Sequence, residues 1–180
     1  MNLNNVSYVG IFVDHIDGEL YTDIPNQHIT LSYRPDSEKF SKLLNYLDTQ
    51  CEVVVMGYGN DGKNEGLLVD IPSNIPYYGA EQKHITLSVG QDSSPVKTGF
   101  LKFENYIPEN ITSQLPEALY GKIAVFTKDK QVIYDANQFE DYNVMKMGNQ
   151  VLDENDFSNE PKPDDNNSIL VEKDETNIGY

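Results

Sequence analysis

The sequence predicts an α+β protein built on a largely antiparallel sheet. Most of its apolar segments are short and rich in β-branched and aromatic residues, which favours strands. Two pairs of these segments are joined by short polar turns of the kind found in β-hairpins. One longer segment has helical spacing. The 180 residues suit one domain, which can bury a core without disulfides or metals.

The first predicted elements are two strands and a helix. Residues 6–14 are rich in β-branched and aromatic types, and residues 27–34 alternate strictly between polar and apolar side chains. Residues 36–50 carry apolar side chains three or four positions apart, which predicts a helix. Asp36 or Ser37 can cap its start.

Two hairpins and a third alternating strand follow. Residues 51–58 and 65–71 flank a polar turn, and residues 83–90 alternate. After the apolar segment 99–106, a short helical turn is expected within residues 109–119. Residues 122–135 then predict a second hairpin that turns at residues 128–130.

The pattern Gly57-x-Gly59-x-x-Gly62 matches the glycine-rich turn of dinucleotide-binding folds. That turn must open a helix whose N-terminus holds the pyrophosphate. A strand-like segment that ends at a proline follows here instead. We therefore interpret these glycines as part of a hairpin.

The chain is strongly acidic, with 29 acidic residues, 13 basic residues and a net charge of −16. This charge would repel a phosphate polymer, so binding to DNA or to long RNA is not expected. A small anion or the end of an RNA can still be held by a local site.

The composition changes near residue 150. Residues 1–150 form the predicted domain, whereas residues 151–180 hold nine acidic residues against two lysines. Such a segment buries too little apolar surface to offset its ordering entropy, which predicts a solvated acidic tail. The alternative is that Ser168-Ile169-Leu170-Val171 docks on a sheet edge or a partner.

The remaining composition favours a cytoplasmic protein, in the host cytoplasm if the source is viral. Cys51 is the only cysteine, so no internal disulfide and no cysteine-based zinc site can form, and it is expected to be buried. The first residues lack the basic and apolar regions of a signal peptide. No segment has the roughly 20 apolar residues of a membrane span.

An identical pentapeptide occurs twice. His28-Ile29-Thr30-Leu31-Ser32 recurs 56 residues later as His84-Ile85-Thr86-Leu87-Ser88. Because alternate residues of a strand share a face, the histidine, threonine and serine of each copy are predicted to lie together. Ile29, Leu31 and Tyr33 of one copy, and Ile85, Leu87 and Val89 of the other, should then face a core.

Two such faces suit an in-line displacement at phosphorus. This reaction needs a base on the attacking oxygen and an acid on the leaving oxygen, and histidine can fill either role at neutral pH. A hydroxyl about 6–7 Å along the strand can stabilise the charge on the phosphate. A metal site built on His28, His84 and a carboxylate is disfavoured, because hydroxyls bind hard cations poorly. His15 has no repeated counterpart and is expected to be structural or exposed.

These two motifs resemble the H-x-[ST] pair of the 2H phosphoesterase superfamily, over roughly residues 8–127. The chain is most similar to the cyclic phosphodiesterase domains of eukaryotic-type tRNA ligases and to stand-alone RNA-repair-like proteins of viruses and bacteria. The resemblance implies a two-lobed fold with a central cleft, and cleavage without a metal or other cofactor. His28 and His84 would be the acid–base pair, and Thr30 and Thr86 the phosphate donors.

Further substrate-binding residues are predicted around these motifs. Ser32 and Ser88 are expected to assist the threonines, and Tyr77 and Tyr78 either stack a base or pack on the hairpin. The cations expected to offset substrate charge, or else to be solvated, are Lys83, Lys97 and Arg34.

The sequence thus predicts an enzyme that cleaves a cyclic phosphodiester. The substrate would be a 2′,3′-cyclic phosphate on a nucleotide or RNA end, or a cyclic oligonucleotide signal of an immune pathway. Two alternatives remain: a sponge that binds a nucleotide in the same cleft without turnover, and a structural protein with a fortuitous repeat. The oligomeric state, the base, the linkage and which histidine is the acid stay open.

Overall fold

The computed structural model describes residues 2–152, and it is an α+β fold with one open, mostly antiparallel sheet of eight strands and few helices. The first strands are β1 (Val6–Val13), β2 (Thr22–Asp23) and β3 (His28–Tyr33). They are followed by helix α1 (Ser37–Leu44), which Asp36 caps by accepting a hydrogen bond from Lys39 N.

The middle of the chain forms three longer strands and two short helices. The strands β4 (Gln50–Asn60) and β5 (Asn64–Asp70) form the predicted hairpin, with Gly62 at φ +83° in its turn. The hairpin interpretation of the three glycines is therefore confirmed. Next come β6 (His84–Val89), a 3₁₀ helix η1 (Pro95–Phe100) and the short helix α2 (Glu109–Thr112).

The last elements are β7 (Leu119–Thr127), β8 (Val132–Ile133) and α3 (Ala136–Leu152). The strands β7 and β8 form the second predicted hairpin. The acidic tail predicted for residues 151–180 lies outside the described residues, apart from the last two positions of α3. No helix in the described range combines the length and the apolar character needed to cross a membrane.

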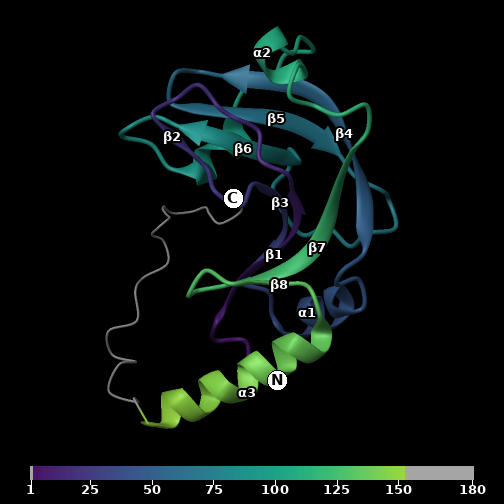
Figure 1. The fold of residues 1–180 in the computed structure, drawn as a ribbon, viewed down its shortest axis with the longest axis vertical. Helices are drawn as coiled ribbons and strands as arrows, with labels where there is room; N and C mark the ends of the chain where they lie inside the picture. Colours follow the sequence, from purple (N-terminus) through teal and green to yellow (C-terminus); the bar gives the residue numbers. More distant parts are fainter. Residues whose placement is uncertain (1, 153–180) are drawn as a thin grey trace.

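The strand order is β2-β6-β5-β4-β7-β1-β3, with β8 paired to β7. Strand β4 joins two halves of the sheet, because its first residues pair with β7 and its later residues pair with β5. Figure 1 shows β2, β6, β5 and α2 in the upper part of the molecule, and β1, β7, β8, α1 and α3 in the lower part. Each half contains one copy of the repeated pentapeptide.

One large core connects both halves. It includes Ile29 and Leu31 of β3 together with Ile85 and Leu87 of β6, all at most 1% exposed. Cys51 is also buried in this core, as predicted. A smaller apolar cluster lies on the opposite face of β1 and β7, around Tyr8, Phe12 and Ala124.

Three elements were not anticipated. Strand β2 is too short to leave a pattern, and residues 95–100 form the 3₁₀ helix η1, for which no element was predicted. Helix α3 has buried Phe139 and Tyr142 three positions apart, and the Asp135 carboxylate accepts hydrogen bonds from the first helical N–H groups. Its packing against the rest of the fold is a tertiary property that the local pattern does not show.

Candidate active site

His28 begins β3 and lies over the aromatic side chains of β1. Its ring stacks on Tyr8, with the ring centroids 4.3 Å apart, and lies 5.4 Å from Phe12. The Nδ1 atom donates to Asn26 O at 2.9 Å, and the Tyr8 hydroxyl is 3.1 Å from the same nitrogen. The Nε2 atom lies 3.2 Å from Thr30 Oγ1. The ring is therefore held in one orientation.

His84 begins β6 and is 3% exposed. Its Nδ1 atom donates to Gln82 O at 2.7 Å, while the buried Nε2 atom has no hydrogen-bond partner among the described residues. Burial lowers the pKa of His84 below its ordinary value, against a smaller opposite effect of the hydrogen bond to Gln82. The ring is thus favoured in its neutral form, with the lone pair on Nε2.

The two histidine rings are oriented by the same type of hydrogen bond. In each copy Nδ1 donates to the carbonyl two residues earlier, on Asn26 or on Gln82. A carbonyl oxygen only accepts, so this contact keeps the proton on Nδ1 and leaves the lone pair of the neutral ring on Nε2. Local backbone geometry thus prepares both rings in the same way.

The strands β3 and β6 lie next to each other although they are far apart in the strand order. The Gln27 amide donates to Leu87 O at 3.1 Å, and Ile24 N donates to the same carbonyl at 3.0 Å. At the other end, Tyr78 N donates to Leu31 O at 2.7 Å. Because the apolar residues of both strands share one core, the histidines and threonines of both copies point away from that core.

The threonines follow the histidines on the same face. Thr30 lies opposite Gly10 on β1, and Thr86 lies opposite Gly66 on β5, so each is paired with a residue that has no side chain. The Thr86 hydroxyl is 3.4 Å from Pro95 O at the start of η1, a long contact.

The serines do not share this face, which corrects the prediction for Ser32 and Ser88. The register of β3 skips one residue between Thr30 and Ser32, so Ser32 lies opposite the core residue Val9. The same bulge occurs in β6, where Ser88 lies opposite Glu65. In both strands the bulge turns the serine away from the histidine and the threonine.

The bulge also moves the residues that follow the serines. Tyr33 lies opposite Tyr8 and joins the small aromatic cluster, and Val89 lies opposite Asn64. The prediction that Tyr33 faces the core was therefore wrong, because an extra residue shifts the alternation by one, whereas Val89 is buried as predicted.

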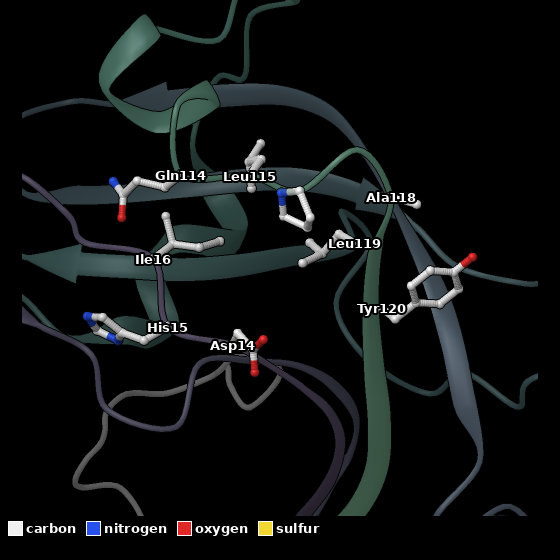
Figure 2. Close-up of a pocket in the computed structure, with 9 residues that line it drawn as sticks. Asp14, His15, Ile16, Gln114, Leu115, Ala118, Leu119 and Tyr120 are labelled. Carbon is white, nitrogen blue, oxygen red and sulfur yellow. The ribbon is translucent and has the colours of Figure 1, made fainter.

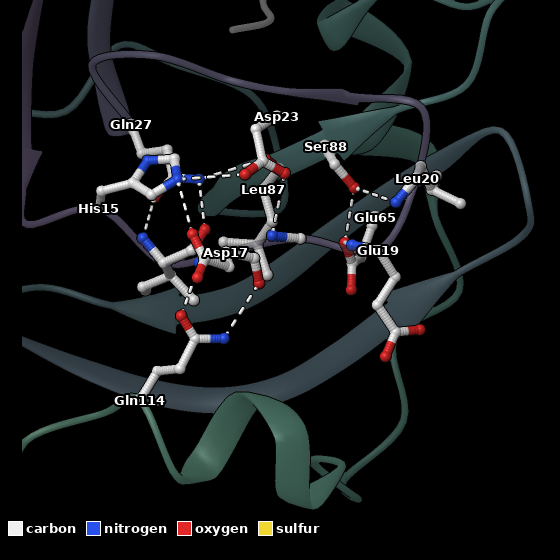
Figure 3. Close-up of polar contacts among 12 residues, drawn as sticks. His15, Asp17, Glu19, Leu20, Asp23, Gln27, Glu65, Leu87, Ser88 and Gln114 are labelled. Carbon is white, nitrogen blue, oxygen red and sulfur yellow. Dashed lines mark hydrogen bonds and ion pairs between the residues drawn. The ribbon is translucent and has the colours of Figure 1, made fainter.

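Ser88 has a structural contact instead. Figure 3 shows its hydroxyl donating to Glu65 Oε1 at 2.6 Å and accepting from Leu20 N at 3.0 Å. Glu65 is fully buried and also accepts from Glu19 N and from the Tyr58 hydroxyl. Ser88 and Glu65 thus hold the loop that leads into β2 against the sheet.

Tyr77 and Tyr78, the two tyrosines predicted to stack a base or to pack, make contacts within the fold. Tyr77 donates its hydroxyl to Ala80 O at 2.5 Å, and burial raises its pKa. Tyr78 packs against the main core, and Lys39 lies over its ring. Of the two interpretations, packing is the one that these contacts favour.

The three predicted cations differ in their surroundings. Lys83 Nζ lies over the Tyr77 ring at 4.7 Å, and the Arg34 guanidinium lies over Tyr33 at 5.3 Å. Arg34 follows β3 with φ +49°, outside the alternation that was expected to place it with His28. Lys97 is exposed in the last turn of η1, on the element that packs over the face of His84.

His15 belongs to a different group. Its Nε2 atom lies 3.2 Å from Asp23 and 3.3 Å from Asp17, and these exposed side chains are the ones that could hold a metal ion within the described range (Figure 3). A cavity of about 460 Å³ lies beside them, between residues 14–16 and residues 114–120 (Figure 2). No residue of the two pentapeptides lines it.

Comparison of the chain with protein-family models, with curated proteins and with solved structures found no match. The candidate site therefore rests on the two histidine–threonine pairs and on the geometry that orients them.

Proposed function

We propose that the protein is a phosphodiesterase that cleaves the cyclic phosphodiester of a nucleotide or of an RNA end. The observation that carries this proposal is the matched orientation of His28 and His84, each with Nδ1 bound to a backbone carbonyl and Nε2 on the same face as a threonine. An in-line displacement at phosphorus is accelerated by a base at the attacking oxygen and an acid at the leaving oxygen, and two such nitrogens can supply them.

The surroundings of the two rings favour a different role for each. His84 is buried with a bare Nε2, which suits a general base. His28 lies on the faces of Tyr8 and Phe12, and an aromatic face stabilises a cation. His28 therefore suits the general acid, which must start the reaction protonated.

The reaction is then a hydrolysis. Water gives a proton to Nε2 of His84 and its oxygen bonds to phosphorus. The bond from phosphorus to one ribose oxygen breaks, and that oxygen takes the proton from Nε2 of His28. The Thr30 and Thr86 hydroxyls donate to the non-bridging oxygens, where negative charge increases. The product is a phosphate monoester, and solvent restores both protonation states.

The fold supports the proposal through its two halves. A 2H-type phosphoesterase carries one motif on each of two lobes, with a cleft between them. Here β3 belongs to one half of the sheet and β6 to the other, and β4 joins the halves. The proposal therefore includes a two-lobed arrangement with the four motif residues on the walls of a central cleft.

The test is an assay in EDTA with 2′,3′-cyclic mononucleotides and cyclic di- and trinucleotides, with products identified by mass. His28→Ala and His84→Ala are each expected to lower kcat by about 10²–10⁴-fold, because each removes a proton-transfer group. His15→Ala is the matched control, since His15 is exposed and lies outside the pentapeptides. It should keep the activity of the parent protein.

Each other outcome contradicts part of the proposal. Activity that survives in either pentapeptide variant would exclude the two-histidine mechanism. Activity lost in EDTA and restored by a metal would exclude catalysis by these side chains alone. Tight binding of one nucleotide without turnover would make the protein a nucleotide-binding sponge.

A further inference from the structure

A cavity of about 400 Å³ lies beside His84, between the segment before β6 and the helix η1. Its lining residues come from two short segments: Ala80, Glu81, Gln82, Val96, Gly99 and Phe100. This volume is within the usual range of small-molecule sites. Phe100 is 70% exposed, although it is a large apolar side chain.

The wall of this cavity also contacts the histidine ring. A Cβ atom placed on Gly99 would lie 3.1 Å from His84 Cε1 and 3.5 Å from Ala80 Cβ. Gly99 therefore lets η1 approach the ring. Gly99 lines the cavity and lies next to the His84 ring, so a ligand in the cavity would occupy a subsite beside His84.

The polar side chains that line the cavity offer hydrogen-bond acceptors. The Gln82 amide nitrogen donates to Gly99 O at 2.9 Å and to Leu101 O at 3.0 Å, which leaves its Oε1 atom as an acceptor. Glu81 adds a carboxylate, and no described residue that lines the cavity is basic. A phosphate is therefore disfavoured here, and a neutral ring with several N–H donors is favoured.

We propose that this cavity binds the base of the substrate nucleotide and selects guanine. Guanine carries two adjacent donors, N1–H and the 2-amino group, and a carboxylate accepts from both in a bidentate pair. Phe100 provides the ring on which the base stacks. The inference rests on the proposed function, because the phosphate joined to this base would then lie at His84 and Thr86.

The other bases match these acceptors less well. Adenine offers its 6-amino group beside an N1 atom that is itself an acceptor and would face the Glu81 carboxylate. Uracil offers one N–H between two carbonyls, and cytosine pairs an amino group with an acceptor nitrogen. Inosine keeps N1–H and lacks the 2-amino group, so it isolates the second hydrogen bond.

The test measures binding of 5′-GMP, 5′-IMP, 5′-AMP and 5′-UMP to the full chain by calorimetry. We expect 5′-GMP to bind about tenfold more tightly than 5′-IMP, and more tightly than the other two, since a hydrogen bond to a charged group is lost. Glu81→Gln should abolish this preference, because a carboxamide presents one acceptor and one donor. Glu52→Gln on β4 makes the same charge change at an exposed position outside the cavity, and should keep the preference.

A second variant separates stacking from selection. Phe100→Ala should weaken all four ligands by about fivefold or more, while the ratio between 5′-GMP and 5′-IMP stays the same. Equal affinity for the four nucleotides, or a guanine preference that survives in Glu81→Gln, would overturn the inference. Turnover of cyclic substrates without base preference would overturn the guanine inference and still support the proposed phosphodiesterase activity. Guanine selection without turnover would support the guanine site and contradict the proposed phosphodiesterase activity.

Discussion

Because Gly10 has no side chain, the Tyr8 ring can stack on the His28 ring. A Cβ atom there would lie 2.8 Å from Ile29 O, and 3.4 Å from both the Tyr8 and the His28 rings. The Tyr8 ring therefore crosses the position of Gly10 to reach His28. Sequence reasoning missed Tyr8 and Gly10, because their role depends on the register between β1 and β3.

The pKa of His84 leads to a prediction about pH dependence. Burial lowers this pKa, so the base stays unprotonated to a lower pH than an ordinary histidine with a pKa near 6.5. In kcat/KM measured from pH 4.5 to 8, we expect the acidic limb to fall below pH 6.5. A limb at or above 6.5 would contradict His84 as the base.

The same shift affects stability in a defined direction. The unfolded chain binds this proton at a higher pH than the folded chain does. The free energy of unfolding should therefore decrease as the pH falls from about 6.5 towards the lowered pKa, and then level off.

At the scale of elements, β3 and β6 each contain a bulge at the same position of the pentapeptide, which the sequence alone does not reveal. Strict alternation predicts one polar face of His, Thr and Ser, and it holds for the histidine–threonine pairs. The extra residue then turns Ser32 and Ser88 to the opposite face. A bulge depends on the partner strand, so a single-strand pattern cannot locate it.

Helix α3 is held to the β7–β8 turn through Asp129. Its carboxylate accepts hydrogen bonds from the Tyr142 and Thr127 hydroxyls and pairs with Lys146 Nζ at 3.0 Å. Although partial burial acts in the opposite direction, the hydrogen bonds from Thr127 and Tyr142 and the charge of Lys146 hold the pKa of Asp129 at about 2.

Asp129→Asn should destabilise the protein by on the order of 1 kcal/mol at pH 7, a value reduced because the carboxylate is partly exposed. A lowered pKa contributes stability above the unfolded value of about 3.9, and this contribution is lost as the pH falls towards 2. Urea unfolding of the parent protein and of Asp129→Asn between pH 7 and pH 2.5 measures the difference in their free energy of unfolding. This difference should shrink below pH 4.

Asp141→Asn is the matched control for this experiment, since it makes the same charge change at an exposed position of the same helix. A difference between Asp129→Asn and the parent protein that stays constant down to pH 2.5 would contradict the assigned role of the Asp129 carboxylate.

At the scale of the whole molecule, the net charge of −16 opposes the approach of any phosphate ligand. Added salt screens this repulsion, so kcat/KM for a cyclic nucleotide should rise a few fold between about 20 and 150 mM salt. Proteins that bind nucleic acids through cations behave in the opposite way. A decrease of kcat/KM with salt would show that local cations such as Lys97 dominate the approach.

The sequence alone predicted most of the fold class and singled out the residues of the candidate site. Period-two alternation and hairpin turns predicted the strands, because these are local properties of neighbouring residues. The repeat identified the two histidine–threonine pairs without any knowledge of their distance in space.

Only the tertiary structure decided how these residues are arranged in space. It brought β3 beside β6 through Gln27, turned the serines away through two bulges, placed Tyr8 under His28, and brought Gly99 of η1 next to the His84 ring. The physical reason is that burial, pairing register and ring contacts arise between segments far apart in the chain. The residue order of a single strand does not contain them.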